Sequence, residues 1–554
     1  MPVECSARPC IMADGSVFTL LQAGDSMSSR PSIPDYDLCI IGGGVNGAGI
    51  ARDATGRGLS VLLLEIGDLA GATSSASSKM IHGGLRYLEY FEFKLVREAL
   101  IERDVLLGIA PHIMYPMDFI LPHAHTIRPA WMIRLGLFLY DHLARIRHFK
   151  RSTAIKVAED ARCAPLKNDY KTAFTYADGW VDDARLVALN AVDAAEMGAH
   201  ILTHAACTGL HVENGIWHVE MYDTDTGQSA THTARMVVNA AGPWVRDILD
   251  GSQLTIPGKT PNVRLVKGSH IVVPKLYDGS QAFNLQQPDR RVIFVIPYQD
   301  KYTLIGTTDI DHPDDTQAPE ISPEETQYLC DCVNRYFKSS IAPSDVVWSY
   351  SGVRPLFDDG RGKASKVTRD YRLILDTDHG APILSVFGGK ITTYRHLAQE
   401  AVNKLIRFWP NYAAARGMDT IKPWTHTMHL PGGDIGDDGM DAFIAERTRR
   451  YKFLPATVVR RYATTYGTRM DRILAEATDL DSLGRHFGDG VYMAEINYLI
   501  QNEWVKCADD MLWRRTKLGL HISDETRTAI EQYFEGHPVS SQTARGANVT
   551  RQIH

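Results

Sequence analysis

The chain has 554 residues, of which 44% are hydrophobic and 23% charged, a composition typical of a globular protein with two or three domains. The formal net charge of −7 argues against a nucleic acid as the main partner. The eight cysteines are scattered, and the sequence lacks the common zinc-protease, hydrolase and phosphate-loop motifs. We therefore expect reduced, structural cysteines and no metal site.

Prolines and small polar residues fill the first 34 residues. Their apolar stretch, Val17–Leu21, is short and follows no basic run, which does not match a secretory signal. We expect a disordered extension, or an over-long start with Met12 or Met27 as the real initiator. No stretch of the sequence is long and apolar enough to predict a bilayer-spanning helix.

A glycine-rich turn follows the first apolar run. Tyr36–Ile41 is typical of a buried strand, and Gly42, Gly44 and Gly47 follow it at G-x-G-x-x-G spacing. In a dinucleotide fold these glycines allow a tight turn, close approach of the backbone to a pyrophosphate, and close helix–strand packing. The N-terminus of the next helix then offers free N–H groups to the phosphates.

A second apolar run, Ser60–Leu64, predicts a parallel strand buried on both faces. It ends in Glu65, where a dinucleotide fold places a carboxylate for the adenosine ribose. An acid at this position disfavours NADP, because a 2′-phosphate would be better matched by arginine. These residues predict a dinucleotide cofactor but do not distinguish FAD from NAD.

The loop Ala72–Lys79 is dense in hydroxyl groups that can donate hydrogen bonds to the pyrophosphate and ribityl chain of FAD. The alternative is a serine-rich surface linker. The loop continues into Met80–Tyr87, which is too apolar and glycine-rich for a linker.

At this point the chain resembles the FAD-dependent glycerol-3-phosphate dehydrogenases of the aerobic, respiratory, quinone-linked type. The resemblance extends from about Tyr36 to about Leu520 and leaves out both tails. Its motifs include IIGGGVNGAGIARDATGRGLSVLLLE, ATSSASSKMIHGGLRYLE, WVDDARLV, VNAAGPWV, VKGSHIVVP, YSGVRPL, LSVFGGKITTYR and ADDMLWRRTKLG.

The resemblance implies an α/β fold with a discontinuous Rossmann-like FAD-binding domain, an antiparallel-sheet substrate domain and a C-terminal α-helical domain. The oxidoreductase region is expected over residues 35–425 and the helical domain over 426–545. Within the first, we expect FAD-binding parts at about 35–115, 178–262 and 350–425, and substrate parts at about 116–177 and 263–349.

Local patterns predict further elements. Apolar spacing favours a helix over Leu85–Leu107, and Leu384–Thr393 repeats the pattern of strand, glycine turn and helix. The charged runs Glu446–Lys452 and Trp513–Lys517 are expected to be solvated helix faces, with a partner or lipid role as the second interpretation.

The site residues follow from matching positions in the family. His270 is expected to take the proton, with His82 as an alternative, and Arg354 to bind the substrate oxygen. Arg86, Tyr87 and Lys390 are expected to bind the substrate, with the two cations holding its phosphate. The residues expected to bind the cofactor are Gly42, Gly44, Gly47, Glu65, Thr73, Ser74, Ser75, Ser78, Gly242, Gly388, Gly389, Lys390 and Thr392.

The implied reaction is FAD-dependent oxidation of sn-glycerol 3-phosphate to dihydroxyacetone phosphate, with a hydride passing to flavin N5 and electrons to ubiquinone or menaquinone. One alternative is an oxidase that reduces oxygen. A second is an enzyme similar to amino-acid or amine oxidases, and a third is a dinucleotide-binding sensor without turnover. A homodimer is left open.

The segment Pro129–Arg151 joins a short apolar helix to a basic loop. It fits a helix lying on an anionic membrane surface, or a buried core helix with a basic loop. The resemblance implies a peripheral enzyme on the cytoplasmic face of the inner (plasma) membrane.

Overall fold

The computed structural model describes residues 33–539, apart from 124–127, 146, 290, 313–318, 359–369, 412–413, 415–420 and 476. The extension expected over residues 1–34 lies almost wholly outside the described residues. The described cysteines form no disulfide with one another. None of the described helices is both long enough and apolar enough to cross a membrane.

The first sheet has a parallel centre in the order β18, β10, β1, β2, β7, with β17 antiparallel at one edge. A hairpin of β8 and β9 extends β10. Its central strands are buried on both faces, as their continuous apolar runs predict. The strands are β1 (Tyr36–Ile41), β2 (Val61–Glu65), β7 (His200–Thr203), β8 (Ala205–Glu213), β9 (Ile216–Asp223), β10 (Ser229–Asn239), β17 (Arg372–Asp376) and β18 (Ile383–Phe387).

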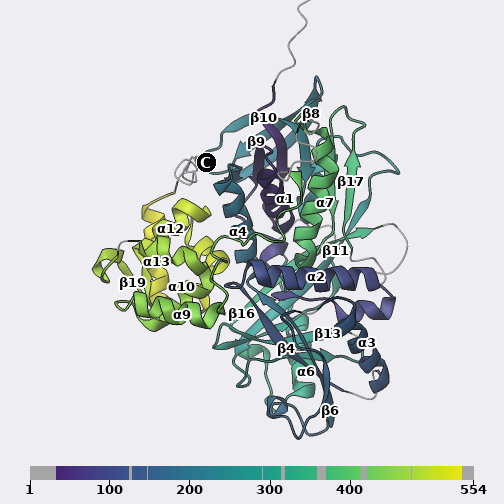
Figure 1. Ribbon diagram of the computed structural model, residues 1–554, viewed down its shortest axis with the longest axis vertical. Helices are drawn as coiled ribbons and strands as arrows, with labels where there is room; N and C mark the ends of the chain where they lie inside the picture. Colours follow the sequence, from purple (N-terminus) through teal and green to yellow (C-terminus); the bar gives the residue numbers. More distant parts are fainter. Residues whose placement is uncertain are drawn as a thin grey trace, which may run out of the picture. The chain divides into compact units, whose positions relative to one another are not determined.

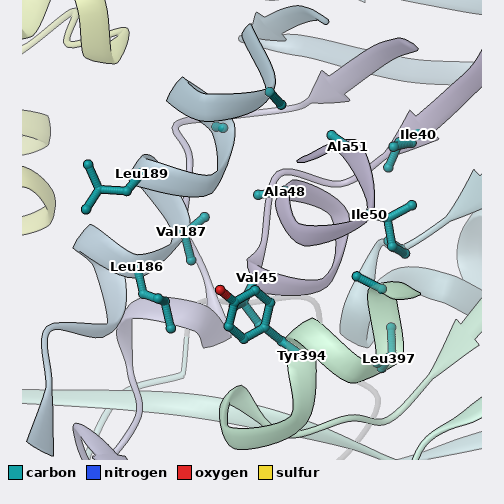
Figure 2. Close-up of a cluster of buried hydrophobic side chains, with 14 of the residues drawn as sticks. Ile40, Val45, Ala48, Ile50, Ala51, Leu186, Val187, Leu189, Tyr394 and Leu397 are labelled. Carbon is teal, nitrogen blue, oxygen red and sulfur yellow. The ribbon is translucent and has the colours of Figure 1, made fainter. Parts of the chain in front are cut away.

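Helix α1 (Val45–Gly56) packs between α4 (Asp183–Glu196) and α7 (Tyr394–Leu405) through small residues. Figure 2 shows Ala48 and Ala51 of α1 facing into this cluster, with Tyr394 of α7 below them. A Cβ on Gly49 would lie 2.8 Å from the Tyr394 ring, so this contact requires glycine. Small residues thus let α1 approach its neighbours closely and fix the glycine turn at its start.

The second sheet is mostly antiparallel, in the order β15, β11, β14, β13, β12, β4, β6, β3; β16 pairs with β11, and β5 with β6. The one parallel pair among these is β4 with β12. The strands are β3 (Met80–Ile81), β4 (Met114–Pro122), β5 (Thr153–Lys156), β6 (Thr172–Val181), β11 (Asn262–Pro274), β12 (Ala282–Gln286), β13 (Val292–Tyr298), β14 (Tyr302–Gly306), β15 (Ile310–Asp311) and β16 (Trp348–Asp358).

Residues from about 430 to 539 have their own hydrophobic core and are mainly helical, as expected (Figure 1). The elements are α9 (Gly439–Arg450), α10 (Ala456–Tyr466), α11 (Met470–Leu474), β19 (His486–Gly488), β20 (Val491–Tyr492), α12 (Met493–Glu503), a π-helical turn (Asp510–Arg515) and α13 (Asp524–Gly536). The remaining α-helices are α2 (Phe93–Ile109), α3 (Ala130–His142), α5 (Val245–Gly251) and α6 (Pro323–Tyr336). Together these observations confirm the predicted fold class.

Two local predictions are wrong. The helix expected over Leu85–Leu107 is two elements: a 3₁₀ helix spans Leu85–Tyr90, and α2 begins only at Phe93. Phe91 between them has a left-handed φ of 61°, which interrupts α-helical backbone. The run Trp513–Lys517 is not a solvated face, because the Arg515 and Lys517 side chains are buried in ion pairs.

Candidate active site

A cavity of about 1450 Å³ is lined by residues of both sheets. This volume exceeds the roughly 300–1,000 Å³ of pockets for drug-sized ligands, so the cavity has room for a dinucleotide and a small substrate together. The predicted site residues that line it are Gly42, Gly44, Glu65, Thr73, Ser74, Ser78, Arg86, Tyr87, Gly242, Arg354, Gly388, Gly389, Lys390 and Thr392. Gly47, Ser75 and His270 are not among its lining residues.

The glycine turn provides a bare backbone wall at one end of the cavity. Gly42 has a φ of 107°, and a Cβ there would lie 2.6 Å from the Ala240 carbonyl oxygen. A Cβ on Gly47 would lie 1.9 Å from the Gly42 carbonyl oxygen, so this position packs the helix against the turn. Helix α1 starts directly at the wall and presents its N-terminus, as a pyrophosphate requires.

Glu65 ties the turn to the loop after β2. One carboxylate oxygen accepts a hydrogen bond from the Gly43 N–H at 2.6 Å, and the other accepts from the Gly67 N–H at 2.9 Å. Burial raises the pKa of Glu65, and these two hydrogen bonds oppose that rise. Glu65 lines the cavity where the fold places an adenosine ribose.

The hydroxyl-rich loop holds the turn from the other side. The Val45 N–H at the start of α1 donates to the Ser74 hydroxyl at 3.0 Å. Thr73 donates to the Val353 carbonyl at 2.7 Å, which anchors the loop to β16. Ser75 donates to the Ala72 carbonyl at 3.2 Å, so its hydroxyl is used within the loop.

Three cationic side chains face the cavity from separate segments. Arg86 follows Gly83 and Gly84 and has no carboxylate partner among the described residues. The Lys390 ammonium lies 3.8 Å from the centre of the Tyr87 ring. Arg354 on β16 pairs with Asp309 and donates to the Thr307 hydroxyl at 2.9 Å.

The loop that carries Arg86 is fixed by a buried ionic group. Asp178 pairs with Arg103 at 2.8 Å and accepts a hydrogen bond from the Tyr140 hydroxyl at 2.7 Å. The Gly83 N–H donates to the same Tyr140 oxygen at 2.8 Å. This support fixes the backbone just before Arg86. The sequence did not single out Asp178, because a lone aspartate within a strand gives no distinguishing signal.

His270 lies in a cross-strand row with Gly306, Phe294 and Asn284, which are paired in register on β11, β14, β13 and β12. A Cβ on Gly306 would lie 2.1 Å from His270 Cδ2, so glycine makes room for the imidazole. The imidazole stacks on Tyr350 with ring centres 4.8 Å apart. Its Nε2 lies 2.8 Å from the Ser78 hydroxyl oxygen.

Burial is the main cause that holds the pKa of His270 well below its usual value. The positive charges of Arg354 and Lys79 lower this pKa further. Lys79 lies over the other partner in the stack, with its ammonium 4.6 Å from the Tyr350 ring centre. Lys79 itself pairs with buried Asp183 at 2.8 Å. These effects favour a neutral His270 imidazole. The Ser78 hydroxyl separates this imidazole from the cavity.

His82 lines the cavity directly. Its ring packs edge-on against Phe294 at 6.5 Å, and its backbone N–H donates to the Thr392 hydroxyl at 3.3 Å. Of the two candidate bases, His82 therefore packs against the Phe294 ring, and His270 lies two strands away from Phe294 in the same cross-strand row. Phe294 of β13 and Asn284 of β12, which the sequence analysis did not single out, also line the cavity.

The glycine turn, the acidic strand end and the cavity define a class of protein, the FAD-dependent oxidoreductases. The family model described as FAD dependent oxidoreductase matches residues 37–395. A second model, the C-terminal domain of alpha-glycerophosphate oxidase, matches residues 423–535. FAD is thus the cofactor, and the bare glycine wall fits its pyrophosphate.

The chain belongs to the family of FAD-dependent glycerol-3-phosphate dehydrogenases. It is 48% identical to aerobic glycerol-3-phosphate dehydrogenase of Escherichia coli, over 90% of this chain and 97% of that protein. It is 49% identical to D-erythritol 1-phosphate dehydrogenase of Brucella abortus over the same shares. Glycerol-3-phosphate dehydrogenase from Bacillus halodurans, solved with FAD, superposes with a TM-score of 0.69 at 25% identity, over 91% of this chain and 95% of that one.

Proposed function

We propose that this enzyme oxidises the C2 hydroxyl of sn-glycerol 3-phosphate to give dihydroxyacetone phosphate. Bound FAD supplies the hydride acceptor, at N5 of its ring system. The proposal rests on the three cationic side chains of Arg86, Lys390 and Arg354, which line the same cavity as the glycine turn. A phosphate dianion needs such cations, whereas a neutral polyol does not.

Arg86 and Lys390 are assigned to the phosphate. Arg86 has no carboxylate partner in the described part of the chain, so its guanidinium is available to a dianion. Tyr87 holds the Lys390 ammonium in place through its ring face. The charge of Arg354 is already neutralised by its ion pair with Asp309. Arg354 is therefore assigned to donate a hydrogen bond to the substrate oxygen, where one polarising donor is required.

His270 is assigned to accept the hydroxyl proton, with the Ser78 hydroxyl between it and the cavity. A neutral imidazole can receive a proton, and the low pKa of His270 keeps it neutral at physiological pH. His82, which lines the cavity itself, is the alternative.

The test of the substrate is a panel in which oxidation is followed with an artificial electron acceptor. sn-Glycerol 3-phosphate should exceed glycerol in kcat/KM by at least about 100-fold, because the phosphate adds charge-assisted hydrogen bonds. Equal values for the two compounds would refute the phosphate assignment, and turnover of an amine or amino acid in their place would favour the amine-oxidase alternative.

D-Erythritol 1-phosphate is a second candidate substrate. A relative named for it is as similar to this chain as the glycerol-3-phosphate dehydrogenases are. Buried Asn284 lines the cavity and donates to the Tyr176 hydroxyl at 2.8 Å, while its amide oxygen has no hydrogen-bond partner among the described residues. That oxygen can accept a hydrogen bond from an additional hydroxyl group of the longer substrate. The same panel separates the candidates by their kcat/KM values.

Ubiquinone or menaquinone is the proposed electron acceptor. Stopped-flow mixing of reduced enzyme tests this against an oxidase. Rapid reoxidation by a soluble quinone with slow reaction toward oxygen supports the dehydrogenase, and the reverse order of rates supports the oxidase.

We propose peripheral binding to an anionic membrane through α3, on the cytoplasmic face. One face of α3 is buried through Ile133 and Leu137, while Trp131, Leu135 and Phe138 on the other face are 50–66% exposed. Exposed basic residues follow the helix over 145–151. This combination of exposed apolar and basic groups fits an interfacial helix.

A further inference from the structure

The C-terminal helical domain reaches the cofactor cavity at one point. Among the described residues of 426–539, Arg514 alone lines the cavity, alongside Ile66, Gly67 and Asp68. Arg514 belongs to the π-helical turn Asp510–Arg515. Such turns are rare and occur frequently at functional sites.

Arg514 and Arg515 both bind one carboxylate of the cofactor domain. Asp68 accepts from Arg514 Nε at 2.5 Å and from the two terminal nitrogens of Arg515 at 2.9 and 2.7 Å. The Asp68 side chain is 4% exposed and that of Arg515 is 0% exposed. A buried carboxylate is stable only when it is paired, so Asp68 depends on the docked domain.

Asp68 also belongs to the loop that shapes the cofactor site. It follows Glu65 by three residues, and Glu65 accepts hydrogen bonds from both Gly67 and Gly43. The position of the loop is therefore set from one side by the glycine turn and from the other by the helical domain. In dinucleotide folds, the end of the cavity beside Glu65 receives the adenosine.

We propose that Arg514 completes the adenosine end of the FAD site, so that FAD binding and docking of the C-terminal domain stabilise each other. A guanidinium can stack on a base or donate to a ribose oxygen. The coupling is reciprocal: whatever the docked domain adds to FAD affinity, bound FAD must add to docking.

Other contacts join the helical domain to the cofactor domain without reaching the cavity. Buried Arg185 pairs with Glu503 at 3.0 Å, and Lys506 pairs with Asp225 at 2.6 Å. Arg472 pairs with Glu196 at 2.8 Å and is half exposed. Arg472→Gln is therefore a matched control, because it removes an arginine–carboxylate contact between the same two domains away from FAD.

The first experiment measures the dissociation constant of FAD by the recovery of free-flavin fluorescence on dilution of the full-length holoprotein. Arg514→Gln should raise it about 10-fold or more, the effect of losing a hydrogen bond to a charged group. Arg472→Gln should stay within about twofold of the wild-type chain. A wild-type dissociation constant for a folded Arg514→Gln variant would overturn the proposal.

The second experiment needs no substitution. Hydrogen exchange of the full-length chain is compared at limiting and saturating FAD. Amides of the segment 506–520 should exchange several-fold more slowly with FAD bound, whereas those of α9, which supplies none of the interface contacts named above, should be unchanged. Equal exchange of 506–520 in both states would overturn the coupling even if the variant failed to fold.

Discussion

His270 Nε2 lies 2.8 Å from the Ser78 hydroxyl oxygen, and of this pair only Ser78 lines the cavity. A proton released in the cavity can therefore reach the imidazole through a single hydroxyl group. The imidazole itself is 1% exposed and stacks on the Tyr350 ring.

His270→Ala should lower kcat by about 10²–10⁴-fold, the usual contribution of a general base. FAD content should be retained, because His270 does not line the cavity. In the wild-type chain the acidic limb of kcat/KM should lie well below the usual histidine range, because burial depresses the pKa of His270. Near-normal turnover of His270→Ala would transfer the role to Arg354 or His82.

Arg86→Met should raise KM for sn-glycerol 3-phosphate by roughly 10- to 100-fold, because a charged hydrogen bond to the phosphate is lost. Steady-state kinetics with saturating electron acceptor provide the measurement. Arg97→Met is the matched control, since Arg97 is an exposed arginine of α2 and does not line the cavity. An unchanged KM in the Arg86 variant would remove Arg86 from the phosphate site.

The cofactor half of the candidate site is easier to predict from sequence than the substrate half, for a physical reason. Gly42, Gly44 and Glu65 are local in sequence, and their spacing follows directly from the strand–turn–helix geometry. The substrate wall forms through register across β11, β14, β13 and β12, so no sequence spacing reveals that His270 and Phe294 share one cross-strand row. The role of Trp513–Lys517 was missed because its partner, Asp68, is more than 400 residues away in the chain.

Gly47→Ala should prevent tight FAD binding. The added Cβ would lie 1.9 Å from the Gly42 carbonyl oxygen, so the turn or α1 has to move. The ratio of flavin to protein absorbance after purification checks this. In Gly108→Ala the new Cβ meets nothing within 4 Å, so this helical control should keep its flavin and gain about 0.5–1 kcal/mol in stability. Full flavin in Gly47→Ala would contradict the assigned role of the turn.

His112 should make the fold sensitive to acid. Burial, aided by the charges of Arg185 and Arg469, lowers its pKa to about 3. Between that value and the ordinary histidine pKa of about 6.5, the unfolded chain binds more protons at this residue than the folded chain does. The contribution of His112 to stability therefore rises with pH across this window and is lost as pH falls, by at most about 1.4 kcal/mol per pH unit.

Thermal unfolding temperatures measured at pH 6.5 and 4.5 check this contribution. His112→Gln should show a smaller loss on acidification than the wild-type chain, because glutamine does not titrate. His211→Gln, at a side chain that is 46% exposed, should behave like the wild type. Identical acid sensitivity in all three proteins would rule out His112 as a contributor.

Phe138→Ser should weaken co-sedimentation with anionic vesicles at low salt, since Phe138 is 57% exposed on the apolar face of α3. Val347→Ser removes a comparably exposed apolar side chain, 52% exposed, that does not belong to α3, and this variant should bind as the wild type does. High salt should release both proteins if the basic loop contributes. Wild-type binding by Phe138→Ser would exclude this face as the membrane contact.

Bound FAD should be reduced by sn-glycerol 3-phosphate in this cavity. The most direct measurement is the visible absorption spectrum of the purified holoprotein without oxygen, recorded before and after that compound is added. The flavin band should bleach with sn-glycerol 3-phosphate and not with glycerol. A flavin-loaded protein whose band is unchanged by sn-glycerol 3-phosphate would contradict the proposed reaction.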